Sequence, residues 1–308
     1  MRFTIYQESR QGGRPNNEDR TTYCYSREAL LMVVADGMGG HHYGEIASQI
    51  AVQTLADSFQ REARPTLVDP FRFLQKGMTN AHHAILDFAE RHKLSDTPRT
   101  TCVACLVQDN VAYWAHAGDS RLFLMRGGKV VAQTRDHSRI RILIEEGLLS
   151  EARAATHPDR NKIYSCLGSP TPPEIEFSRK TPLNHGDILR LCTDGLWGEK
   201  NDSAMAQAPK GSNIVHAVPM LLSQAKAKGG QHVDNLSVVA VRWEETYLDE
   251  ASSSISTQTM ALDEIATHIE EFGRDPAHKT DLSEDEIEKA IEEIRAAIDK
   301  FNPKKQGQ

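Results

Sequence analysis

Four short motifs, each built around a carboxylate, lie far apart in this chain and constrain its fold more than any other feature. They occupy residues 14–19, 35–40, 192–197 and 233–235. Three of the acids follow or begin apolar runs that are typical of β-strands. A carboxylate at a strand end, held by a glycine turn, contributes little to a hydrophobic core and is well suited to hold a metal.

The acids in these motifs are Glu18, Asp19, Asp36, Asp194 and Asp234. No His or Cys accompanies them at ligand spacing, and carboxylates alone favour a hard cation such as Mg²⁺ or Mn²⁺. Five acids gathered in one pocket would repel each other and would stay ionised only beside cations. Two divalent ions about 3.5–4 Å apart, bridged by one carboxylate, would resolve the repulsion and activate a water for attack on a phosphoryl group.

Two neighbouring residues complete this predicted site. Gly37 has no Cβ, so the backbone can approach closely and its carbonyl oxygen can face an ion. Arg14 carries a guanidinium, which binds a phosphate through two hydrogen bonds and does not compete for the metal. The motifs supply no nucleophilic Ser, Cys or His, so the expected reaction is direct attack by water.

Composition and charge exclude several other classes of protein. The chain has 308 residues, of which 39% are hydrophobic, and no apolar run approaches the roughly 20 residues of a membrane span. Its first residues are polar and carry no signal-peptide core, so we expect a cytoplasmic protein without a membrane partner. Residues 244–308 hold 17 Asp and Glu against 7 Lys and Arg, and such an acidic region argues against nucleic-acid binding.

The five cysteines do not suggest a disulfide framework, because their number is odd. Cys102 and Cys105 form a C-x-x-C pattern inside a β-like run. Strand alternation would direct the two side chains to opposite faces of a sheet. Two buried thiols are therefore a better interpretation than a redox or zinc site.

Residues 1–243 alternate between strand-like and helix-like patterns, which favours antiparallel sheets covered by helices over a parallel βαβ fold. Turn dipeptides at 109–110 and 127–128 predict two hairpins. A short helix is expected within the polar stretch 136–168. Strands are expected at 29–35, 102–107, 111–116, 122–125, 129–132, 188–192 and 235–243, and longer helices at 45–62, 70–93 and 209–228.

The sequence changes character after residue 243. A polar linker is predicted for 244–259, followed by an acidic helical extension over 260–308 with helices at 260–272 and 282–301. The second helix has a capping-box pattern at Ser283 and Glu286 and an apolar stripe at helical spacing. That stripe must pack on the main domain, on a second copy of the chain or on a partner, and the sequence does not separate these alternatives.

The motifs in their order resemble the metal-dependent serine/threonine protein phosphatases of the PPM (PP2C-type) family, in its bacterial branch. The resemblance covers residues 1 to about 243, and as a set the motifs are highly specific. The matching positions are Arg14, 17–19, 34–41, 44–45, 47–48, 100–101, 117–121, 136–138, 192–197 and 234–237.

The resemblance implies an α+β fold, a four-layer α-β-β-α sandwich of two antiparallel sheets flanked by helices, with the metals at one end. It implies that Asp36 bridges two Mn²⁺ or Mg²⁺ ions and that Asp194 and Asp234 complete the first metal site. The Gly37 carbonyl and a carboxylate of the Glu18/Asp19 pair would serve the second, and the family pattern leaves open which of the two contacts the ion. Asp119 matches the position that, with Asp194, holds a third and weaker ion. Arg14 would bind the substrate phosphate.

The implied activity is hydrolysis of phosphoserine and phosphothreonine in proteins, opposing a bacterial Ser/Thr kinase. Met38 stands where many eukaryotic members have a His proposed as general acid, so the general acid stays unassigned. Arg99 and Ser165 also depart from the family pattern, in regions that affect the flap over residues 136–168 and substrate preference. The alternatives are an inactive phosphatase-like binding or sensor module, and a phosphatase of small phosphoesters or anti-anti-sigma-type proteins.

Overall fold

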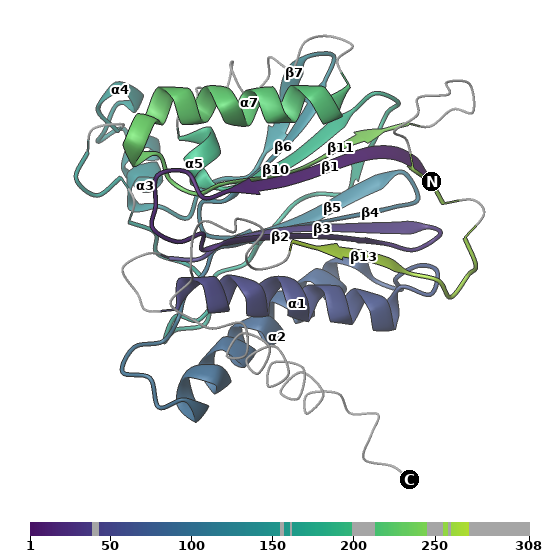
Figure 1. Ribbon diagram of the computed structural model, residues 1–308, viewed down its shortest axis with the longest axis horizontal. Helices are drawn as coiled ribbons and strands as arrows, with labels where there is room; N and C mark the ends of the chain where they lie inside the picture. Colours follow the sequence, from purple (N-terminus) through teal and green to yellow (C-terminus); the bar gives the residue numbers. More distant parts are fainter. Residues whose placement is uncertain are drawn as a thin grey trace.

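Two antiparallel β-sheets pack face to face in the computed structural model, and helices cover the outer face of each sheet (Figure 1). The structure describes residues 1–38, 43–154, 157–160, 162–198, 213–244, 255–257 and 260–270. Helices α1 (Gly44–Glu62) and α2 (Pro70–Arg91) lie below one sheet, and α7 (Ile214–Gly229) lies above the other (Figure 1). The predicted four-layer sandwich is therefore confirmed.

The first sheet has six strands in the order β12-β1-β11-β10-β6-β7. The second has seven strands, in the order β13-β2-β3-β4-β5-β8, with β9 also paired to β5. The bounds are β1 Arg2–Arg10, β2 Asp19–Tyr25, β3 Ala29–Asp36, β4 Cys102–Gln108, β5 Val111–Ala117, β6 Arg121–Arg126, β7 Lys129–Gln133, β8 Glu176–Phe177, β9 Thr181–Pro182, β10 Ile188–Cys192, β11 Leu236–Trp243, β12 Ile255–Ser256 and β13 Ala266–Ile269.

Short helices lie between the strands near one end of the sandwich. They are α3 (Arg139–Glu145), α4 (Glu151–Ala154), α5 (Asp194–Trp197) and the 3₁₀ helix η1 (Gly230–His232). The predicted helix in the polar stretch after residue 136 corresponds to α3. Among the described residues, no helix has both the length and the apolar character needed to cross a membrane.

Strand β3 shows why the sheets sit in the middle layers. Its side chains alternate between two cores, because successive residues of a strand point to opposite faces. Leu31 and Val33 pack towards α1 and α2, whereas Met32 and Val34 pack between the two sheets. A third core lies between α7 and the outer face of the first sheet. A strand buried on both faces explains the continuous apolar run before Asp36.

The two predicted hairpins are present. Asp109 and Asn110 both have positive φ angles, 54° and 58°, and join β4 to β5, as expected for a two-residue hairpin turn. Glycines 127 and 128 likewise join β6 to β7. Cys102 lies in the core between its sheet and helices α1 and α2, and Cys105 lies in the core between the two sheets. The prediction of opposite faces is confirmed, and all five thiols are free and buried.

The predicted helix at 260–272 is wrong where the structure describes it. Residues Ala266–Ile269 form β13, which pairs antiparallel with β2 at the edge of its sheet. An edge strand offers unpaired backbone groups, and pairing with them outweighs a weak helical pattern. The ring of His268 also stacks on Tyr23, with centroids 4.7 Å apart.

Part of the predicted polar linker 244–259 is built into the fold. Residues Ile255–Ser256 form β12 and pair with β1, and Thr257 is fully buried. Thr257 donates a hydrogen bond from Oγ1 to the carbonyl oxygen of Arg27 at 2.7 Å. The predicted helix at 282–301 lies outside the described residues, and the division at residues 243 and 259 stays a prediction.

Candidate metal centre

The acids predicted from the sequence lie together at one end of the two sheets. Asp36 is the last residue of β3, and Asp19, the first residue of β2, is its antiparallel partner. Asp194 begins α5 directly after β10, and Asp234 precedes β11. Asp119 lies in the turn between β5 and β6. Strand ends from both sheets thus bring together residues that are more than 200 positions apart.

These residues surround a cavity of about 290 Å³. Glu18 lines it, whereas Asp19 does not and lies buried behind the wall with 1% of its surface exposed. The lining consists of Arg14, Pro15, Asn16, Glu18, Asp36, Gly37, Met38, Thr101, Asp119, Ile163, Asp194, Asp234 and Asn235.

Asp19 is only partly satisfied in its buried position. Its Oδ2 accepts a hydrogen bond from Thr193 Oγ1 at 2.9 Å. Its Oδ1 is buried without a hydrogen-bond partner. A buried carboxylate oxygen with no donor is costly, and a nearby cation or a water held by one is the kind of partner that would satisfy it.

Five carboxyl groups of the cluster, those of Glu18, Asp19, Asp36, Asp119 and Asp194, have raised pKa values. Burial, followed by the charge of Glu45, raises the pKa of Glu18 to about 7. Burial also raises the pKa of Asp19 to about 7, and burial together with Asp234 raises that of Asp194 to about 6.

The pKa values of Asp36 and Asp119 likewise lie well above the usual range, because both groups are buried and have acidic neighbours. Without cations the cluster therefore tends to retain protons. Divalent ions would replace those protons and remove the mutual repulsion.

The backbone at Gly37 is as close to its neighbours as the sequence predicted. A Cβ on Gly37 would lie 2.4 Å from the carbonyl oxygen of Gly44 and 2.7 Å from that of Glu18. The Gly37 amide also donates to the Glu18 carbonyl oxygen at 3.1 Å. No larger residue fits there, and the peptide of Gly37 stays in the wall of the cavity.

Arg14 lies at the mouth of the cavity, with 48% of its side chain exposed. Its guanidinium donates a 2.5 Å hydrogen bond to Asp234 Oδ2. This contact places the cation beside the acids while leaving it accessible from solvent, which suits a group that receives an incoming phosphate.

Asn235 holds three segments of the site together, a role that the sequence reasoning did not assign. Its Nδ2 donates to the carbonyl oxygens of Gln11 at 2.7 Å and Asn16 at 2.9 Å. Its Oδ1 accepts from the Glu18 amide at 2.9 Å. The sequence signals were its place directly after Asp234 and its inclusion in the matched stretch 234–237.

Two further contacts orient the acids and were also missed. The Thr101 amide donates to the Asp36 carbonyl oxygen at 2.8 Å, and Thr101 Oγ1 accepts from the Asp36 amide at 3.1 Å. Trp197 Nε1 donates to the Asp119 carbonyl oxygen at 3.0 Å. The Trp197 ring lies under the guanidinium of Arg121, 3.5 Å from its centroid. The motifs at 100–101 and 192–197 were recognised in the sequence, but the contacts that Thr101 and Trp197 make depend on the tertiary fold.

Met38 lines the cavity, in agreement with its motif position, and its thioether cannot donate a proton. The neighbouring residues His41 and His42 lie outside the described residues. The structure thus brings together every predicted site residue, Arg14, Glu18, Asp19, Asp36, Gly37, Asp119, Asp194 and Asp234, with Asp19 behind the cavity wall.

Comparisons with known proteins agree with this arrangement. A family model described as protein phosphatase 2C matches residues 7–217. The chain is 29% identical over 231 residues to the serine/threonine phosphatase stp of Listeria innocua, an alignment covering 74% of this chain and 90% of the relative.

Two solved structures are similar over most of the chain. The serine/threonine phosphatase of S. agalactiae matches with a TM-score of 0.72 and 27% identity, over 79% of this chain and 100% of that protein. The catalytic domain of the serine/threonine protein phosphatase PstP, in complex with two manganese ions, matches with a TM-score of 0.67 and 28% identity, over 80% of this chain and 100% of that one.

Proposed function

The chain belongs to the protein phosphatase 2C family and is a serine/threonine protein phosphatase, and from this premise we propose that it works with two divalent cations, Mn²⁺ or Mg²⁺. The proposed reaction is hydrolysis of phosphoserine and phosphothreonine in proteins by direct attack of water. We further propose that the enzyme opposes a bacterial Ser/Thr kinase. The names of its relatives support phosphoprotein substrates.

The observation that carries the metal dependence is the buried acid cluster. Its pKa values are raised, and Asp19 Oδ1 has no hydrogen-bond partner. An all-oxygen donor set of this kind fits Mg²⁺ or Mn²⁺ and does not favour softer ions. The manganese ions in the PstP structure support the same class of cation.

We assign the ligands from their places around the cavity. Asp36 ends β3 and lines the cavity together with Asp194 and Asp234, and it would be shared by both ions. Asp194 and Asp234 would hold the first ion, and the Gly37 carbonyl the second. Glu18 would also contact the second ion, because it lines the cavity whereas Asp19 lies behind it. Asp119, which lines the cavity with Asp194, would hold a third and weaker ion.

When bound, the cations supply an acidified water and positive charge for the phosphoryl group. The protein residues position the phosphate and the metal-binding acids. Arg14 binds the phosphate at the mouth of the cavity by exchanging its contact with Asp234. Asn235 and Thr101 hold the backbone of Glu18 and Asp36 in place by accepting hydrogen bonds from their amides. Among the described residues, those that line the cavity include no His or Cys, which supports water as the nucleophile.

The proposal is tested by hydrolysis of a phosphothreonine peptide, first in EDTA and then with added Mn²⁺ or Mg²⁺. We expect activity only with metal, and none in Asp36→Ala, with circular dichroism showing that the variant is folded. Asn213→Ala is a suitable control, because Asn213 caps α7 away from the cavity. Near-normal turnover in Asp36→Ala, or full activity in EDTA, would contradict the proposed site.

A further inference from the structure

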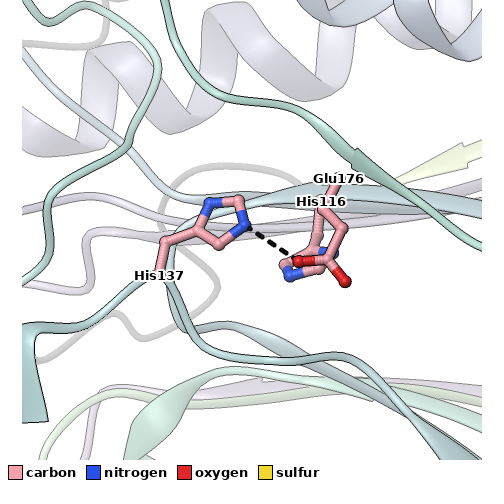
Figure 2. A group of neighbouring side chains, drawn as sticks. All are labelled: His116, His137 and Glu176. Carbon is pink, nitrogen blue, oxygen red and sulfur yellow. Dashed lines mark ion pairs between the residues drawn. The ribbon is translucent and has the colours of Figure 1, made fainter. Parts of the chain in front are cut away.

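Two buried histidines and a glutamate lie together outside the carboxylate centre (Figure 2). His116 on β5 and Glu176 on β8 are direct partners across the two strands. His137 comes from the segment that follows β7, and its ring centroid lies 4.6 Å from that of His116. The group therefore joins the edge of one sheet to the edge of the other.

Each histidine has a ring nitrogen without a hydrogen-bond partner. His116 and His137 are 2% and 1% exposed, and His116 Nδ1 and His137 Nε2 have no hydrogen-bond partner. Unpaired nitrogens of two buried side chains at one place are costly unless something else binds there. Burial also lowers the pKa of both imidazoles, which keeps them in the neutral form that binds metals.

One ring nitrogen of each histidine and one oxygen of the carboxylate are spaced as ligands of one ion. The three ligand atoms lie within 4.8 Å of one another, and His137 Nε2 is 3.6 Å from Glu176 Oε2. Two atoms that each lie about 2 Å from a zinc ion are at most about 4 Å apart. The 3.6 Å between His137 Nε2 and Glu176 Oε2 already falls within this limit, and the half-exposed Glu176 side chain leaves room for water as a fourth ligand.

The surroundings of His116 match those of a metal-binding histidine. Its Nε2 donates to the carbonyl oxygen of Arg135 at 2.6 Å, which leaves Nδ1 as the unprotonated nitrogen with a lone pair and no hydrogen-bond partner. Metal-binding histidines donate their second nitrogen to a carbonyl or carboxylate in this way.

We propose that His116, His137 and Glu176 form a second cation site, which binds a zinc-class divalent ion with imidazole and carboxylate ligands. Two imidazoles and one carboxylate favour Zn²⁺ over the hard ions expected at the carboxylate centre. The two sites thus differ in the metal that they select.

Occupancy of this site acts on the phosphatase centre through Gly118, an inference that rests on the proposed function. The Gly118 amide donates to His137 Nδ1 at 3.3 Å, so the neutral ring carries its proton on Nε2. A metal on Nε2 moves that proton to Nδ1, where it faces the Gly118 amide and breaks the contact. Gly118 precedes Asp119, so a bound zinc-class ion displaces the turn that carries Asp119 and lowers turnover.

Cobalt provides a direct test of the site, because four-coordinate Co²⁺ absorbs visible light much more strongly than six-coordinate Co²⁺. Full-length protein is saturated with Mg²⁺ and titrated with Co²⁺. We expect one equivalent to give the intense spectrum. Glu176→Gln should weaken binding by at least about tenfold, whereas Glu174→Gln, a matched change two residues away on the same segment, should bind as wild type does.

The proposed site is overturned if the wild type gives no intense spectrum. It is also overturned if Glu176→Gln binds Co²⁺ as tightly as the wild type does and gives an equally intense spectrum. This readout needs no enzymatic activity, so it is independent of the proposed phosphatase reaction.

The link to Gly118 is tested by titrating Zn²⁺ into the Mn²⁺-saturated enzyme, with each protein compared with its own zinc-free rate. The half-inhibitory Zn²⁺ concentration should be about tenfold higher in Glu176→Gln than in wild type and Glu174→Gln. Equal sensitivity of all three proteins overturns the link. A wild type without Mn²⁺-dependent activity contradicts the proposed function instead, and leaves the cobalt result unaffected.

Discussion

At the scale of single residues, the site depends on side chains that hold its backbone and its acids in place. Asn235 fixes the loop before β2 by three hydrogen bonds to backbone groups. Thr193 orients the carboxylate of Asp19 by donating a hydrogen bond from Oγ1 to Asp19 Oδ2. Supporting residues of this kind set the geometry and basicity of metal ligands, so their loss should affect metal affinity first.

We expect Asn235→Asp to raise the Mn²⁺ concentration needed for half-maximal activity by about 10- to 100-fold. The substitution keeps the acceptor for the Glu18 amide but replaces two hydrogen-bond donors with an oxygen that repels the carbonyl groups of Gln11 and Asn16. Metal titration of phosphopeptide hydrolysis measures the effect.

Asn213→Ala is the matched control for this prediction. It removes a helix cap on α7 and should cost about 1 kcal/mol of stability without changing the Mn²⁺ requirement. An unchanged requirement in Asn235→Asp would show that Asn235 has no part in metal binding.

Asp36, Asp119 and Asp194 could be predicted from the sequence because each stands beside a glycine in a recognisable motif. Glu18, Asp19 and Asp234 could be predicted because they belong to the motifs of the family pattern. Asn235, Thr193 and Trp197 could not be assigned a role in that way. Their partners, Glu18, Asp19 and Asp119, are 78 or more positions away in the chain. Only the tertiary fold brings these pairs together.

At the scale of elements, β13 closes the edge of the sheet beside β2. Glu270, directly after β13, accepts from the Ser9 amide at 3.2 Å and from Thr21 Oγ1 at 3.0 Å. It therefore joins the C-terminal segment to a strand of each sheet. The segment beyond residue 243 contributes to the phosphatase fold instead of only following it.

Glu270→Ala should lower the free energy of unfolding by about 1–3 kcal/mol, because it removes two hydrogen bonds to a charged group and leaves donors unpaired. Urea unfolding measures this. Glu264→Ala, in the exposed turn before β13, should change stability by less than about 0.5 kcal/mol. Equal stability of the two variants would contradict the role given to Glu270.

The long, strongly apolar strands and the amphipathic helices α1 and α2 were predictable, since one local pattern dominates in each. The strand β1 was not predicted, because its second half, Gln7–Arg10 in the sequence, is polar and only partly buried. Its pairing with β11 supplies what the local pattern lacks. The strand β13 was predicted as a helix because the sequence does not show that β2 has an unpaired edge with which this segment can form a sheet.

At the scale of the whole molecule, the acid cluster joins the two sheets. Asp19 and Asp36 belong to one sheet, and Asp194 and Asp234 adjoin the other. Cations bound among them would hold the sheets together and stabilise the native state by mass action, by about 2.7 kcal/mol at a free concentration 100 times the dissociation constant.

This stabilisation should grow with pH between about 4 and 7. In the metal-free protein Glu18 and Asp19 have pKa values of about 7 and Asp194 of about 6, above the unfolded values near 4. Their protonated forms therefore stabilise the metal-free fold at low pH, and that contribution is lost as pH rises through 7. Cations bind the deprotonated forms, so protons compete with them at low pH.

The measurement is the shift in unfolding temperature on adding Mn²⁺, compared at pH 5.5 and 7.5. We expect the larger shift at pH 7.5, and a much smaller shift at both values in Asp36→Ala. A shift that is independent of pH would contradict competition between protons and the cation.

The five cysteines make the molecule convenient for site-specific labelling. All are free and buried, and burial raises the pKa of Cys24 and Cys166 to about 11 and of Cys102 and Cys192 to about 12. Native thiols of this kind react slowly with maleimides. A cysteine introduced at Leu148, which is 71% exposed beside α3, would be the one readily labelled thiol. A fluorophore there would test whether the segment around α3 moves during turnover, without removal of any native cysteine.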